Sequence, residues 1–326
     1  MDSGNGHRSF RPEVFVEPAG IGSFPPPAPP RRRTRSTIIA GVLFVLTVFS
    51  TLAVGAQFTA AYRANHPPFS TGDLDPYAGI FAHPGLLLTG LPFAFTLMGI
   101  LLAHELGHFF ACRYYGIAAS YPYFIPAPTL IGTLGAFISI RSPIINRKAL
   151  FDIGLAGPVV GFAFALPALA AAILTSKIVS AGPVQPVIAF GSPPLEKLLM
   201  AILRPGVRAE DLLLSPVGWA AWVGLFATAL NLLPAGQLDG GHIVYALASA
   251  SHRRLSLAVA IALVPLAWFW SGWLLWAVLL LAIGFRHPPL VDRWDPIDGK
   301  RRLWAVIGLV IFLLCFTPTP FAIHGG

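Results

Sequence analysis

The sequence has little charge. Only 11% of its 326 residues are Asp, Glu, Lys or Arg, whereas a soluble globular protein carries about 25%. A water-soluble domain of this size could not cover itself with so few polar groups, so a soluble enzyme and a disordered chain are excluded. Cysteine is scarce as well. Cys112 and Cys315 lie far apart in the chain, which excludes a disulfide scaffold and a cysteine-type zinc site.

Apolar residues are abundant instead and occur in long blocks. They make up 55% of the chain, and the blocks approach the length of about 20 residues that an α-helix needs to cross a bilayer. The runs are continuous rather than alternating, which argues against a transmembrane β-barrel. We therefore predict an all-α polytopic membrane protein with about seven transmembrane helices. The predicted crossings are residues 37–57, 86–112, 151–174, 216–233, 255–270, 273–285 and 303–318.

The segment between the second and third crossings, residues 116–149, is dense in Pro, Gly and β-branched residues. It is too polar and interrupted to cross a membrane, yet too apolar for an ordinary loop. Within it, Leu130 to Ile140 predicts one or two short strands, with Gly132 and Gly135 at positions where another backbone can approach closely. We expect a small membrane-associated β-hairpin that protein shields from lipid.

Basic residues are distributed unevenly between the predicted loops. With the N-terminus placed in the cytoplasm, the inside segments hold 17 Lys and Arg residues and the outside segments hold 5. This bias follows the positive-inside rule. It predicts a multi-pass protein of the cell membrane with a cytoplasmic N-terminus, and it accounts for the net charge of +8 without a nucleic-acid partner.

One motif in the second crossing carries chemistry. His104-Glu105-Leu106-Gly107-His108 is an HExxH sequence. Residues four apart lie on one helix face, so both imidazoles can bind one metal ion while the adjacent carboxylate reaches a water molecule on it. Zinc accepts imidazole and carboxylate ligands and lowers the pKa of bound water toward neutrality. The alternative is two histidines that only cap the helix end, but ionisable groups inside apolar crossings are usually functional.

A third protein ligand is needed. Only three acidic residues lie in or beside the crossings, namely Glu105, Asp152 and Asp239. Asp239 follows the break of the fourth crossing at Pro234 and precedes two glycines. A broken helix buried in protein can present a ligand at membrane depth. Asp239 can also serve as the N-cap of the helix that follows.

Two further features concern the surroundings of these motifs. Gly154, Gly157 and Gly161 in the third crossing allow another helix to approach closely inside a bilayer. His242 lies three residues after Asp239, where it either supports that carboxylate or is a structural polar residue.

The two motifs together resemble those of a known family. HExxH in an early crossing, followed in a later one by the pattern Asn-x-x-Pro-x-x-x-Leu-Asp-Gly that begins at Asn231, is similar to the site-2 protease family of intramembrane zinc metalloproteases, in the branch without a PDZ domain. The resemblance implies that His104, His108 and Asp239 bind zinc. It also implies that Glu105 is the catalytic base and that Asn231 helps to hold the substrate or polarise its carbonyl.

The implied function is hydrolysis of peptide bonds in or near the transmembrane helices of substrate proteins within the lipid bilayer. Two further residues are expected to bind substrate: Gly135, in the hairpin, and Asn146, on the cytoplasmic side of it. The expected organisation is a disordered tail (1–36), a first anchor with an external loop (37–84), the metalloprotease core (85–250) and additional C-terminal crossings (251–326).

Two other functions stay open at this point. A transporter of metal ions or small solutes could use the same histidines as a transient site, but it would need no base at Glu105. A non-catalytic membrane chaperone of the same fold is the third candidate, and the complete set of metal-binding residues argues against it. The sequence makes no prediction of the oligomeric state.

Overall fold

The computed structural model describes residues 33–69, 83–179, 188–283, 290, 292 and 296–323. Most of the predicted tail and part of the predicted external loop lie outside this range. The helices are α1 (Arg33–Arg63), η1 (Pro84–Gly90), α3 (Leu91–Tyr114), α4 (Arg147–Thr175), α5 (Pro194–Leu203), η2 (Ala209–Asp211), α6 (Pro216–Asn231), α7 (Asp239–Leu266), α8 (Gly272–Ile283) and α9 (Gly299–Cys315). The strands are β1 (Tyr123–Pro126), β2 (Thr133–Phe137), β3 (Lys177–Ile178), β4 (Ile188–Phe190), β5 (Leu212–Leu213) and β6 (Phe321–Ile323).

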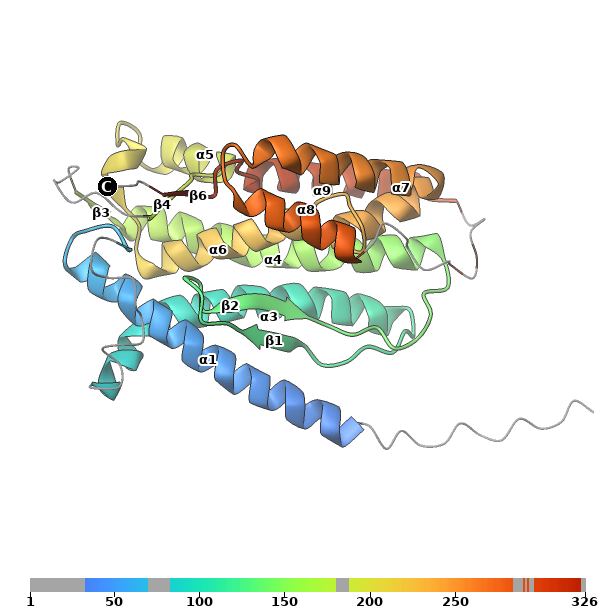
Figure 1. The fold of residues 1–326 in the computed structure, drawn as a ribbon, viewed down its shortest axis with the longest axis horizontal. Helices are drawn as coiled ribbons and strands as arrows, with labels where there is room; N and C mark the ends of the chain where they lie inside the picture. Colours follow the sequence, from blue (N-terminus) through green and yellow to red (C-terminus); the bar gives the residue numbers. More distant parts are fainter. Residues whose placement is uncertain are drawn as a thin grey trace, which may run out of the picture.

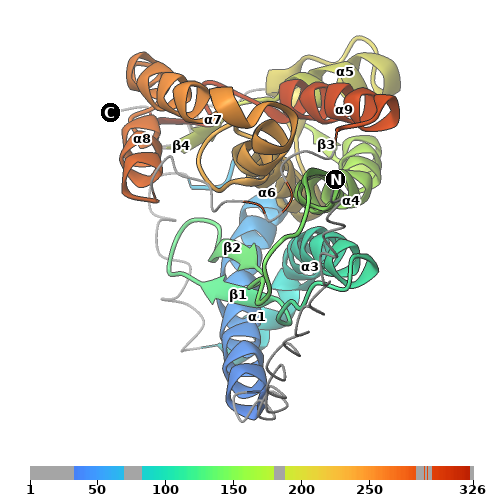
Figure 2. The ribbon, with the colours of Figure 1, turned by 90° about the vertical axis from the view of Figure 1, so that its right-hand side faces the viewer.

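The helices are stacked in layers (Figure 1). α3, α4 and α6 to α9 run roughly side by side, and α1 crosses below them at an angle. α4 lies at the centre of this arrangement, because it packs against α3, α6, α7 and α9. Figure 2 shows β1 and β2 beside α3 and above α1. Two layers of helices and one small hairpin therefore meet around α3 and α4.

Four helices have the length and apolar composition needed to cross a bilayer. They are α1 from Arg35, η1 together with α3, α4 and α7. The predicted class of a helical multi-pass membrane protein is thus confirmed. The other predicted crossings correspond to α6, α8 and α9, which have 16, 12 and 17 residues. These are shorter than the length of about 20 residues expected of a crossing, so the number of seven stays a prediction.

The helix α7 reverses direction within its length. Ala248 has non-helical angles (φ −146°, ψ 65°), and the residues after it fold back. His252 Nε2 lies 3.1 Å from the Gly236 carbonyl oxygen, and the Gly236 N–H donates to Ser256 Oγ at 3.1 Å. A straight helix would separate residues 16 positions apart by about 24 Å. Asp239 therefore begins a short helix, and the second part of α7 returns beside the loop that precedes it.

The predicted hairpin is present but begins earlier than expected. β1 and β2 pair antiparallel, with Phe124 opposite Ala136. Only β2 falls in the predicted stretch of residues 130–140. β1 was not predicted, because it contains Pro126 and lacks the glycines that marked the second strand. Gly132 (φ +82°) lies against α1, where Ser50 Oγ donates to its carbonyl at 2.6 Å and a Cβ would lie 2.7 Å from the Ser50 carbonyl oxygen. Gly135 (φ +104°) instead faces open space.

Charged side chains join the ends of distant helices. Arg301 of α9 donates from Nε to Asp152 of α4 at 2.9 Å and from Nη2 to the Tyr115 hydroxyl, beyond α3, at 3.0 Å. Arg147 of α4 donates to the carbonyls of Ala246 and Leu247 at 2.6 and 2.7 Å. Those carbonyls lie just before the reversal of α7, where a helix end leaves them without helical partners. The ends of α3, α4, α7 and α9 are therefore fixed relative to one another.

Candidate metal centre

The HExxH motif lies in the second half of α3 and faces the protein interior. His104, Glu105 and His108 are exposed by only 5, 4 and 6%. Their ligand atoms all lie within 4.8 Å of one another. Burial of three polar side chains in a membrane helix is costly unless they have partners, which marks this part of α3 as a site.

Asp239 supplies a carboxylate to the two histidines. Its Oδ2 lies 3.2 Å from His104 Nε2 and 3.3 Å from His108 Nε2, and the two Nε2 atoms are 3.1 Å apart. The three atoms thus form a nearly equilateral triangle. The geometry follows from the fold, because α6 ends at Asn231, the chain turns, and Asp239 opens the next helix, α7, which packs against α4.

This triangle has the dimensions of a zinc site. A tetrahedral zinc ion with ligands at about 2.0–2.1 Å keeps its ligand atoms about 3.3 Å apart. The tautomer of His108 also fits, because its Nδ1 donates to the Ile153 carbonyl at 2.7 Å and leaves the Nε2 lone pair for a metal. The residues present therefore fit zinc in spacing, donor type and orientation.

Three glycines of α4 make room for the site. Gly154, Gly157 and Gly161 lie on one face of the helix, at spacings of three and four residues. A Cβ on Gly157 would lie 2.1 Å from His108 Nε2, and one on Gly161 would lie 3.0 Å from His104 Nδ1. The predicted close approach at these glycines is confirmed, and what approaches them includes the imidazole rings themselves.

The loop before Asp239 is held by residues that sequence reasoning missed. Gly236 (φ +58°) is bound through its carbonyl by His252 and through its N–H by Ser256, both buried. A local sequence pattern could not reveal this contact, because it depends on the reversal of α7 at Ala248. The one sign of it in the sequence is the presence of two polar residues, His252 and Ser256, within the apolar helix α7.

A cavity of about 220 Å³ opens at the site. Its walls come from α3, the hairpin, α4 and the turn into α7, and they include His104, Glu105, His108, Asn231, Asp239 and His242. Asn231 Nδ2 lies 3.3 Å from His104 Nε2, so the predicted amide is beside the histidines. His242 lines the cavity near them, and Gly135 lines a smaller adjoining hollow.

Asn146 is not brought to either cavity. Its Oδ1 accepts from the Ala149 N–H at 2.9 Å as the N-cap of α4.

One edge of the hairpin faces the carboxylate of the motif. Ile138 lines the cavity together with Glu105. The N–H of Ser139 donates to Ser120 Oγ at 2.8 Å, on the opposite side. Because N–H groups alternate in direction along an extended chain, Ala136 shares the direction of Ile138. The backbone N–H groups of Ala136 and Ile138 therefore point toward the cavity.

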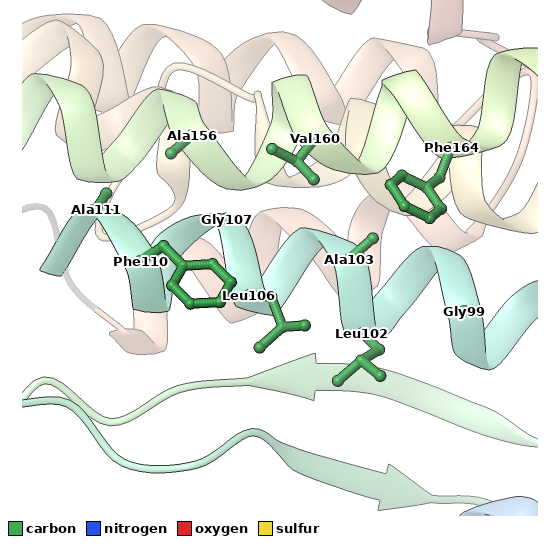
Figure 3. Close-up of a pocket in the computed structure, with 10 residues that line it drawn as sticks. All are labelled: Gly99, Leu102, Ala103, Leu106, Gly107, Phe110, Ala111, Ala156, Val160 and Phe164. Atoms are coloured by element: carbon green, nitrogen blue, oxygen red, sulfur yellow. The ribbon is translucent and has the colours of Figure 1, made fainter. Parts of the chain in front are cut away.

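A larger apolar groove, of about 520 Å³, lies between the outer faces of α3 and α4 (Figure 3). It is lined by Leu102, Leu106 and Phe110 of α3 and by Val160 and Phe164 of α4, the last two pointing toward α3. It contains none of the metal-binding side chains. The groove is thus separate from the candidate centre, although both are built on the same two helices.

Comparison with known proteins agrees with this geometry. The sequence profile described as peptidase family M50 matches residues 92–270. The chain belongs to peptidase family M50. The matched range contains HExxH, the hairpin, the glycines of α4 and the turn to Asp239. The family resemblance stated from the two motifs is therefore confirmed.

Curated M50 relatives are similar to most of this chain. It is 30% identical to the probable zinc metalloprotease EGY2, chloroplastic, of Arabidopsis thaliana, over 74% of this chain and 44% of the relative. It is 35% identical to the rice (Oryza sativa subsp. japonica) probable zinc metalloprotease EGY1, chloroplastic, over 63% and 36%. The rice (subsp. indica) EGY3 protein is 26% identical over 86% and 48%. The chain spans less than half the length of these relatives.

A methyl group at Gly157 is expected to disturb the metal centre. Gly157→Ala places a Cβ on His108 Nε2, so the imidazole must move, and we expect zinc affinity to fall about 10- to 100-fold, as when ligand-orienting contacts are lost. Competition with a fluorescent chelator on the purified protein measures this. Gly99→Ala is the matched control, because a Cβ there meets no atom within 4 Å. Equal zinc affinity in the two variants would contradict the prediction.

Proposed function

We propose that this M50 protein is an intramembrane zinc endopeptidase that hydrolyses peptide bonds in or near the transmembrane helices of its substrates. His104, His108 and Asp239 hold the zinc ion, and Glu105 is the catalytic base. The observation that carries the proposal is the triangle of ligand atoms, 3.1 to 3.3 Å on a side, with a buried carboxylate next to it on α3. The relatives, which are probable zinc metalloproteases, support it.

Each step of hydrolysis can be assigned to a group of this chain. Bound zinc supplies Lewis acidity and makes water nucleophilic near neutral pH. Glu105 accepts a proton from the attacking water and passes it to the nitrogen of the leaving amine. Asn231, 3.3 Å from His104 Nε2, donates from its amide to the substrate carbonyl. The burial of these groups keeps them in a medium where such interactions are strong.

The hairpin edge is proposed to hold the substrate in an extended form. The carbonyls of a helix are bonded internally, so the segment to be cut must unwind, and its backbone then needs new partners. The N–H groups of Ala136, in β2, and Ile138, just beyond it, point away from the first strand and toward the cavity, where a substrate strand can add. Gly135 leaves the adjoining backbone uncovered. Asn146 stays a predicted substrate contact, in addition to its cap on α4.

The predicted topology is retained as part of the proposal. The protein crosses the cell membrane seven times, with α6, α8 and α9 as the short crossings and a cytoplasmic N-terminus. We retain the predicted boundaries of the four parts of the chain, namely the tail (1–36), the anchor (37–84), the core (85–250) and the C-terminal crossings (251–326). The reversal of α7 supports this arrangement, because it lies just before the basic pair Arg253 and Arg254, on the predicted inside.

Cysteine labelling tests the orientation. We expect Asn65→Cys, after α1, to react with a membrane-impermeant thiol reagent in intact cells, and Arg254→Cys to react only after the cells are opened. The two native cysteines are buried and provide a low background. The opposite pattern of labelling would place the metal centre near the outer face.

Removal of the base is expected to separate metal binding from catalysis. Glu105→Gln should keep one zinc ion per chain and lower cleavage about 100-fold or more, because the amide accepts no proton. His108→Ala should lose most of the zinc. Elemental analysis and mass spectrometry of membrane protein fragments measure the two effects. A Glu105→Gln variant with full cleavage would refute the hydrolytic mechanism. A transporter or chaperone predicts a different result, in which the parent protein and the variant both show no cleavage.

Proline substitutions test the hairpin edge. Ala136→Pro and Ile138→Pro each remove an N–H on the cavity side, and loss of one hydrogen bond to a bound strand is expected to lower cleavage about fivefold. Ile138→Val is the matched control, because it keeps the N–H and an almost identical side chain. Phe137→Pro is a second control, because it removes an N–H group that points away from the cavity.

The zinc content of these hairpin variants is expected to stay at one ion per chain. Cleavage by Ile138→Pro equal to that by Ile138→Val would mean that the hairpin does not bind substrate through its backbone. A zinc content that falls in step with cleavage would mean that the prolines act by disrupting the site.

A further inference from the structure

Two hollows of different size adjoin the metal centre. The larger, of about 220 Å³, and a smaller one, of about 100 Å³, share four lining residues. The shared residues are His104, Glu105, Ala136 and Asn231. The candidate metal ligand and the candidate base thus stand where the two hollows meet. A peptide cut at this point has one side in each hollow.

The hollows lie at different positions along β2. Leu134, Gly135 and Ala136 of β2 line the smaller one, whereas the larger is lined by Ala136 and Phe137 of β2 and by Ile138 and Ile140 just beyond it. A strand added to this edge therefore passes from one hollow to the other. In such complexes backbone hydrogen bonds supply affinity and pockets for individual side chains supply specificity. The smaller hollow is placed to receive one side chain next to the bond that is cut.

The walls of the smaller hollow exclude charge. Beyond the shared residues, it is lined by apolar side chains and glycines of α3, β2, α6 and α8, and by Thr228. The Thr228 hydroxyl already donates to the Gly224 carbonyl at 2.9 Å. Among the residues that the structure describes, no Lys, Arg or Asp lines this hollow. A charged substrate side chain would find only Glu105 and His104 there, which are engaged at the metal centre.

The volume of the smaller hollow limits the size of its occupant. An apolar cavity of roughly 150 Å³ holds a benzene ring, and a group the size of a water molecule occupies about 30 Å³. A hollow of about 100 Å³ is smaller than that cavity and holds about three or four methyl-sized groups, fewer than the atoms of an aromatic side chain. This matches the side chains of Val, Leu and Ile, and it also accepts Ala.

From these observations we propose that the hollow between Leu101, Ala136, Ala227 and Trp276 is a specificity subsite that accepts a small or branched aliphatic side chain of the substrate residue next to the cleaved bond. The inference rests on the proposed endopeptidase function and adds the substrate class. Aromatic and charged residues are rejected at this one position.

Two variants change the subsite in opposite directions. Trp276→Leu widens it from α8, and Ala227→Leu fills it from α6. Trp268→Leu and Ala282→Leu are the matched controls, because the former residue is 92% exposed and the latter is also exposed. Each full-length protein is placed in liposomes with a membrane-protein extract from cells whose own copy carries Glu105→Gln. New peptide ends are then mapped by mass spectrometry.

The expected result is a shift confined to one position. The parent protein should cut beside Ala, Val, Leu or Ile at that position. Trp276→Leu should raise cleavage beside Phe about 10-fold relative to Val, and Ala227→Leu should lower cleavage beside Leu about 10-fold relative to Ala, since single methylene groups in such pockets change selectivity 10- to 200-fold. The controls should keep the parent profile.

Three outcomes distinguish the claims. Cuts that depend on Glu105 but show the same residue profile in every variant would overturn the subsite and leave the endopeptidase intact. Equal losses at all sites, with zinc retained, would assign Trp276 and Ala227 a purely structural role and also overturn it. Absence of any Glu105-dependent cut would refute the endopeptidase function itself, and the subsite with it.

Discussion

The arrangement depends on how closely the backbones of α3 and α4 approach. A Cβ on Gly107 would lie 2.6 Å from the Ala156 carbonyl oxygen, and the imidazoles of α3 lie directly on the glycines of α4. Inside a bilayer such contact replaces hydrophobic attraction as the force between helices. It also brings the Ile153 carbonyl within 2.7 Å of His108 Nδ1, which sets the direction of Nε2. Packing and metal geometry therefore have a single cause.

Polar groups in a low-dielectric interior need partners, and the fold provides them across long sequence distances. Arg147 binds the carbonyls that the reversal of α7 leaves unpaired, and Arg301 joins Asp152 to Tyr115. His252 and Ser256 grip both polar atoms of Gly236. These hydrogen bonds lie around α3, α4 and the turn before Asp239, which meet at the candidate metal centre. The polar residues of the chain thus restrict the movement of helices that lipid alone would not hold in register.

Much of the site could be predicted from the sequence, because its signals are local. The spacing of His104 and His108 by one helical turn and the break before Asp239 need no tertiary information. The hairpin was predicted in part, since β2 carries the glycines but β1 has no comparable signal. The grip of His252 on Gly236 could not be predicted, because it follows from a reversal at Ala248, an ordinary helix-forming residue. The cap at Asn146 was likewise hidden, as an Asn before a helix and an Asn beside a substrate look the same in sequence.

The reversal of α7 has a consequence for the order in which the protein is made. The turn that presents Asp239 is supported by side chains 16 and 20 positions after Gly236, so the proposed third ligand leaves the ribosome before the residues that hold its loop. A growing chain that ends between these points contains HExxH and the carboxylate but lacks their support. The two hydrogen bonds to Gly236 can form only after the returning half of α7 has been made. The proposed hydrolase therefore lacks the support of its loop while its own helices are still being inserted.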